Sequence, residues 1–118
     1  ETASPEALKT EQLVDVPLVE SVRNYAKLAQ AAGLAGVVCS AHEAADIASV
    51  TGPNFLRVTP GIRPTGSAVG DQSRVATPGN AASMGSSAIV VGRPITKADD
   101  PVAAYHAIRD DWNAGRKA

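Results

Sequence analysis

Three short, mostly apolar runs, each preceded by a helix pattern, constrain the fold of this chain more than any other feature. The runs cover residues 36–39, 55–59 and 88–91, and each stops at polar or turn-forming residues. A run this short, bounded in this way, is typical of a strand that is buried on both faces. Since strands and helices alternate strictly along the chain, the sequence predicts right-handed βαβ units and a parallel sheet.

Helix caps and stops separate these runs. Ser40 with Glu43 three residues later is a capping box, and Thr77 stands as a cap before Pro78. Glycines that follow the periodic apolar residues predict where the helices end. The expected helices run from Ser4 to about Leu13, from Pro17 to Gly33, from Ser40 to Gly52, from Thr77 to Gly85 and from Asp99 or Asp100 to Gly115.

The second and third runs both lead into a glycine and an arginine. Gly61 and Arg63 follow the second run, and Gly92 and Arg93 follow the third. If the two strands are parallel, backbone N–H groups and two guanidinium groups converge at one edge of the sheet, which suits a phosphate dianion. We therefore predict that these residues bind phosphate. The alternative for each arginine is a surface side chain paired with a nearby aspartate.

Further candidates lie in the long loop over residues 60–76. Loops of this length inside a compact domain are usually functional or disordered. Gln72 is a candidate amide donor to a phosphate oxygen, whereas its charged neighbours are expected to pin the loop. Pro60 and Ile62 either form an apolar wall beside the ligand or pack the top of the fold.

Length and topology together limit the architecture. A chain of 118 residues is long enough for one domain and too short for two. Three parallel strands cannot close on themselves, and a TIM (β/α)8 barrel takes about 250 residues, with its phosphate site commonly after strands seven and eight. The predicted α/β fold is therefore the C-terminal half of a TIM barrel. Residues 1–118 form a single partial domain, from the helix before strand six to the last helix, with open sheet edges that invite association.

Composition excludes several classes of protein. A net charge of −1 gives no basic field for nucleic acid, and no lysine-rich or long apolar run indicates a membrane. The single cysteine, Cys39, precludes an internal disulfide framework and fits a reducing, cytoplasmic location. The polar N-terminus lacks an initiator methionine, which is typical of the interior of a longer chain.

Residues that often carry catalysis have a structural interpretation here. His42 falls in the first turn of a predicted helix and His106 on a charged helix, where both are expected to be solvated. Cys39, at the end of a predicted strand, is expected to be a small buried hydrophobe. No spacing of cysteine and histidine predicts a metal site, and no phosphate-binding P-loop or dinucleotide fingerprint is present.

Four blocks of this sequence stand out when they are taken in order: Gly33–Ala41, Val58–Pro64, Gly70–Arg74 and Ile89–Thr96. Together they resemble orotidine 5′-phosphate decarboxylases of the bacterial branch. The resemblance covers about residues 17–114, and the combination is far more specific than any one block.

The resemblance implies a barrel that converts orotidine 5′-monophosphate to UMP in pyrimidine synthesis, as a homodimer and without a metal or organic cofactor. It implies that Arg93, Gln72 and Arg63 bind the phosphate, that Gly92 presents backbone beside it, and that the long loop closes over the substrate. Family members use phosphate binding to lower the decarboxylation barrier. The pocket beside the pyrimidine would be lined by Pro60 and Ile62.

One departure from the family pattern concerns the catalytic residues. The resemblance implies a lysine–aspartate array built on a D-x-K-x-x-D motif, and none of the four lysines has an aspartate two residues before it. We therefore expect no catalytic residue in this chain and no activity without the N-terminal half of the barrel. Two alternatives are a related sugar-phosphate decarboxylase or synthase and a non-catalytic half-barrel that only dimerises or binds phosphate ligands.

Overall fold

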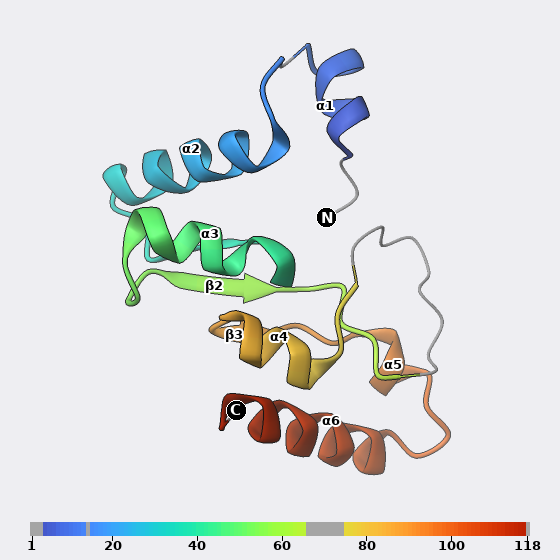
Figure 1. The fold of residues 1–118 in the computed structure, drawn as a ribbon. Coiled ribbons are helices and arrows are strands. Elements are labelled where there is room, and N and C mark those ends of the chain that lie inside the picture. Colours follow the sequence, from blue (N-terminus) through green and yellow to red (C-terminus); the bar gives the residue numbers. More distant parts are fainter. Residues whose placement is uncertain (1–3, 14, 66–74, 118) are drawn as a thin grey trace.

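The computed structural model describes residues 4–13, 15–65 and 75–117. Helices and strands alternate along most of this length (Figure 1). The elements are α1 (Pro5–Thr10), α2 (Leu18–Ala31), β1 (Gly36–Val38), α3 (Ala41–Thr51), β2 (Leu56–Thr59), α4 (Pro78–Met84), β3 (Ala88–Ile89), α5 (Arg93–Thr96) and α6 (Pro101–Arg116).

The three strands form one parallel sheet in the order β1-β2-β3. Val58 of β2 pairs with Val38 on one side and with Ala88 on the other. The parallel sheet predicted from the alternating pattern is therefore confirmed. The strands are shorter than the apolar runs, most clearly β3, where regular pairing ends at Ile89.

Local caps place the starts of the helices. In the Ser40–Glu43 capping box the backbone N–H of Ser40 donates to a carboxylate oxygen of Glu43 at 3.4 Å, and Thr77 accepts from the backbone N–H of Asn80. Asp100 caps α6 in the same way, with Pro101 in the first turn. Each side chain satisfies a backbone donor that the first turn leaves without a partner, as the sequence predicts.

Three predicted helix boundaries are wrong. The helix predicted from Ser4 to Leu13 ends at Thr10, and Leu13 has a positive φ of 58°. Pro17 is the N-cap of α2 rather than part of its first turn. Gly115 does not end α6, which continues to Arg116, because this glycine serves a close helix crossing instead. The short helix α5 was not expected from the sequence at all.

Two buried clusters form the core of the part of the chain that the structure describes. The first lies between α2, α3 and the sheet and includes Cys39, whose 3% exposure confirms that it is a buried hydrophobe. The second joins Ala41, Ile62 and Ala81 beneath α4 and α6, with Trp112 packed against it. The second cluster fixes the residues that follow β2, and so it supports the edge of the sheet where the arginines lie.

One face of the sheet carries large apolar side chains that nothing in the described residues covers. Val38, Leu56 and Val90 are 70%, 49% and 53% exposed. Gly36 faces the same way, because a Cβ there would lie 2.5 Å from the Cβ of Leu56. In a closed barrel the inward-pointing side chains of alternate residues pack against one another. An open apolar face is what half of such a barrel presents.

Helices α4 and α6 cross at two glycines. A Cβ on Gly115 would lie 2.1 Å from the backbone oxygen of Gly79, far closer than any real contact. A Cβ on Gly79 would lie 2.7 Å from the Oδ1 of Asp111. The crossing therefore requires the absence of side chains at both positions, and it holds the start of α4 against the last turns of α6.

We expect Gly115→Ala to lower the free energy of unfolding by about 1–3 kcal/mol, because the new methyl group forces the two helices apart. In a helix without this crossing the same change raises stability by up to about 1 kcal/mol. Urea unfolding followed by circular dichroism measures the difference. Asn113→Ala, at an exposed position of α6, is the control and stays within about 0.5 kcal/mol of the parent. Equal or greater stability of Gly115→Ala would contradict the close crossing.

Candidate phosphate-binding site

The candidate site lies where β2 and β3 end. Because these strands are parallel neighbours, their carboxyl ends meet at the same edge of the sheet. Thr59, the last residue of β2, is buried, and its hydroxyl lies 2.6 Å from the hydroxyl of Ser86, just before β3. Two residues later Gly61 takes a φ of 72°, a left-handed conformation that favours glycine. The turn at Gly61 directs the chain into Ile62 and Arg63.

Arg63 is held tightly at this turn. The residue is 9% exposed, and its Nη1 donates to the backbone oxygen of Ile62 at 2.8 Å. Its backbone N–H donates to the oxygen of Ala76 at 3.0 Å, and Ile62 forms a parallel bridge with Ala76. The two ends of the long loop are therefore joined beside Arg63, and the guanidinium belongs to a fixed part of the fold.

Arg93 is the first residue of α5, and Gly92 is the N-cap of that helix. Both residues are exposed. The backbone N–H of Lys97 donates to the Arg93 oxygen at 3.0 Å, which closes the single turn. The sequence predicts Arg93 directly after a strand, whereas the structure places it on a helical turn four residues beyond Ile89.

The segments Arg63-Pro64 and Arg93-Pro94, which we call the two arginine segments, come together at a cavity of about 220 Å³. Pro64 and Pro94, the residues that follow Arg63 and Arg93, line the same cavity. Pro78, where the chain leaves the long loop and enters α4, lines it too. We call this space the proline cavity. The predicted convergence of the two segments is therefore present, while the binding of phosphate by their side chains stays a prediction.

The other predicted site residues differ in where they lie. Gln72 falls within residues 66–74, outside the described residues. Pro60 is half-buried, so contact with a ligand stays a prediction. Ile62 has 0% exposure and packs in the second core cluster. This packing agrees with the alternative interpretation, in which Ile62 packs the top of the fold. Any role for Ile62 beside a pyrimidine stays a prediction.

The two histidines take no part in this arrangement. His42 is exposed, and its Nε2 lies 3.4 Å from the backbone oxygen of Val75. His106 is exposed on α6 and contacts Tyr105 edge to face, with ring centroids 5.8 Å apart. Within the described ranges no group of three metal-ligating side chains could hold an ion. No helix in those ranges is long and apolar enough to cross a membrane.

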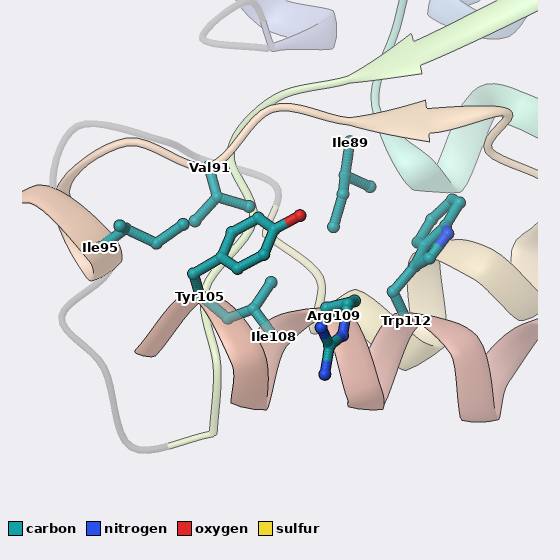
Figure 2. A pocket seen from close by; sticks show the side chains of 7 residues that line it. All are labelled: Ile89, Val91, Ile95, Tyr105, Ile108, Arg109 and Trp112. Atoms are coloured by element: carbon teal, nitrogen blue, oxygen red, sulfur yellow. The ribbon is translucent and has the colours of Figure 1, made fainter. Parts of the chain in front are cut away.

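A second hollow, of about 280 Å³, lies between α6 on one side and β3, the residues after it and α5 on the other. Figure 2 shows side chains of β3, the residues after it and α5 facing those of α6. The apolar side chains of α6 are only partly buried, because Val102 and Tyr105 are 66% and 52% exposed whereas Ile108 is buried. The lining is mainly apolar and does not suit an anion: Ile89, Val91, Ile95, Tyr105, Ile108, Arg109 and Trp112.

Sequence reasoning missed the residues that support the candidate site from below. Asp111 on α6 lines the proline cavity and accepts a hydrogen bond from the backbone N–H of Gly79 at 3.0 Å. The sequence predicts a role only for Pro78, in the first turn of a helix, and the meeting of the three prolines depends on how α6 packs. The available signal is that a proline follows both Arg63 and Arg93.

Comparison with known proteins gives one consistent result. Residues 1–108 match the family described as Orotidine 5′-phosphate decarboxylase / HUMPS family. An orotidine 5′-phosphate decarboxylase of Cutibacterium acnes is 97% identical over 99% of this chain and 50% of that relative. One from Streptococcus uberis is 57% identical over 96% of this chain and 49% of that relative. The chain thus spans about half the length of the curated relatives it matches.

Solved structures give the same result for the fold. A crystal structure of orotidine 5′-phosphate decarboxylase from Lactobacillus acidophilus superposes with a TM-score of 0.78 at 47% identity, over 94% of this chain and 45% of that one. An uncharacterized conserved protein from Geobacillus kaustophilus gives a TM-score of 0.77 at 40% identity. The predicted fold, the C-terminal half of a TIM barrel, is confirmed. By sequence and by fold, this chain belongs to the orotidine 5′-phosphate decarboxylase / HUMPS family.

Proposed function

We propose that this chain is the phosphate-binding half of an orotidine 5′-phosphate decarboxylase, which converts orotidine 5′-monophosphate to UMP and CO2 in pyrimidine synthesis. The other half of the barrel supplies the catalytic residues. The names of the relatives support the reaction, and the half-length match supports the division of labour. We also propose that residues 1–118 form one partial domain and that the complete enzyme is a cytoplasmic homodimer without a cofactor.

The observation that carries the proposal is the meeting of the Arg63-Pro64 and Arg93-Pro94 segments at the proline cavity. Two guanidinium groups at one sheet edge suit a phosphate dianion, because each can donate two parallel hydrogen bonds to its oxygens. In this proposal Arg93, Arg63 and Gln72 bind the phosphate, and the backbone of Gly92 lies beside it. The pocket wall near the pyrimidine is assigned to Pro60 and Ile62.

The placement of the lysines supports a catalyst on the other half. Breaking the bond to the carboxylate leaves an electron pair on the ring carbon, and a proton must be delivered there as CO2 departs. A positioned side chain such as lysine can deliver that proton. None of the four lysines of this chain has an aspartate two residues before it, as the D-x-K-x-x-D motif requires: Lys9, Lys27, Lys97 and Lys117. Binding of the phosphate group, which lies away from the reacting carbon, then helps to lower the activation barrier for decarboxylation.

Two alternatives remain, each with its own support. The matched family is described by two names, so a related sugar-phosphate decarboxylase is the second candidate. The third, a half-barrel that binds phosphate ligands or dimerises without catalysis, is favoured by the missing D-x-K-x-x-D motif and by the uncovered sheet face.

Binding of UMP to the chain tests the phosphate site. We expect UMP to bind at least about tenfold more tightly than uridine, because only UMP engages the two arginines through charge-assisted hydrogen bonds. Titration followed by NMR locates the site through the backbone amides of Arg63, Gly92 and Arg93. Equal affinity for UMP and uridine would contradict the proposal, and tighter binding of a pentulose phosphate would favour the second candidate.

A further inference from the structure

The proline cavity lies under three segments that the proposed phosphate site requires. Pro64 follows Arg63, Pro94 follows Arg93, and Pro78 receives the chain from the long loop. Each proline fixes its own φ, so each segment meets the cavity with little local freedom. The opposite wall belongs to one element, α6, through Ala104, Ala107, Ile108 and Asp111. A single helix therefore supports all three segments.

Of the four α6 residues that line the cavity, Asp111 is the polar one, and it forms a hydrogen bond with the segment that begins at Pro78. Its Oδ2 accepts the backbone N–H of Gly79 at 3.0 Å, within the first turn of α4. That donor has no partner inside the helix, so Asp111 satisfies it from a residue 32 positions away. The glycine crossing allows this approach, because a Cβ on Gly79 would collide with the same carboxylate.

Helix α6 also packs against α5, which begins with Arg93. The contact to Gly79 and the contact to α5 are therefore made by the same rigid helix. A shift of α4 away from α6 would open the proline cavity between Pro78 and the other two prolines. Helix α6 therefore contacts both the start of α4 and helix α5.

We propose that Asp111 is a positioning residue for the phosphate site, which it serves by tying the start of α4 to α6 and so keeping the Arg63 and Arg93 segments in register around the proline cavity. The inference rests on the proposed function for its ligand and on the contacts above for its geometry. Asp111 itself touches no ligand. Its removal weakens binding of the phosphate group alone, and the nucleoside is unaffected.

The test compares three variants of the full 118-residue chain by NMR. Asp111→Ala removes the acceptor, Asp111→Asn keeps an oxygen that can accept from Gly79, and Asp110→Ala is the matched control. Asp110 is the neighbouring carboxylate on the same helix, it pairs with Arg109, and its loss changes the net charge equally. Each variant is titrated with UMP and with uridine, and the amide signals of Gly79, Arg63 and Arg93 are followed without ligand.

For Asp111→Ala we expect faster hydrogen exchange at Gly79, shifted Arg63 and Arg93 amides and UMP binding weakened about two- to tenfold, with uridine unchanged. Asp111→Asn keeps most of the parent's protection at Gly79 and most of its UMP affinity. Asp110→Ala resembles the parent in all of these measurements. The inference is overturned if Gly79 responds while both arginine amides stay in place, since Asp111 then only caps α4. If the parent chain fails to bind UMP, the proposed function fails, and the arginine amides still decide the positioning role.

Discussion

Replacing Arg93 by alanine is expected to weaken UMP binding roughly 10- to 150-fold, the range that corresponds to losing a charge-assisted hydrogen bond worth about 1.5–3 kcal/mol. Arg93 begins α5, an exposed turn that contributes no buried residue to the core. The fold therefore survives the change, and the loss falls on the ligand. Calorimetric titration with UMP and uridine measures it, and uridine affinity stays the same.

Two matched variants make the result specific. Arg109→Ala removes the same charge from α6, where the guanidinium contacts Asp110 at 3.1 Å, and leaves UMP affinity within about twofold of the parent. Arg93→Lys keeps the charge but loses the planar pair of donors, so it recovers only part of the affinity. Equal losses for Arg93→Ala and Arg109→Ala would mean that general electrostatics, and no defined site, attracts the nucleotide.

The parts of this fold that depend on local chemistry could be predicted from the sequence. The capping box of Ser40 and Glu43 needs only residues three apart, and it forms as predicted. The parallel sheet follows from strict alternation, which leaves few connections available. The same topology brings the ends of β2 and β3 together, so the meeting of the two arginine segments could be predicted without knowing any side-chain contact.

The parts of the fold that depend on packing between distant elements could not be predicted from the sequence. Gly115 has the sequence appearance of a helix stop, and its true role appears only when α4 crosses α6. The hydrogen bond from Gly79 to Asp111 and the proline cavity arise from the same crossing. Helix α5 is a single turn after Gly92, too short for any periodic pattern to reveal. Ile62 shows the same limit, since packing decides whether it faces a pocket or the core.

The second large effect concerns catalysis by the reassembled barrel. We expect the chain alone to show no decarboxylation of orotidine 5′-monophosphate, because it lacks the D-x-K-x-x-D motif. Adding the N-terminal half of the Cutibacterium acnes relative, as a separate chain, supplies the missing strands. Those strands cover Val38, Leu56 and Val90, and burial of that apolar face drives assembly. The rate then rises by at least about 10³-fold, the scale on which catalytic residues act.

Arg93→Ala in the mixture separates assembly from function. The variant assembles with the N-terminal half as the parent does, because the arginine lies outside the uncovered apolar face. It then decarboxylates more slowly in proportion to its lost phosphate binding. Size-exclusion chromatography checks the assembly, so a slow mixture is not mistaken for an unassembled one.

The most direct measurement of the central claim is therefore the loss of orotidine 5′-monophosphate over time in three samples: this chain, the N-terminal half and their mixture. The account predicts that only the mixture produces UMP, with each half inactive alone. Production of UMP by this chain alone, or an assembled mixture that remains inactive, would contradict the assignment of this chain as the phosphate-binding half of the enzyme.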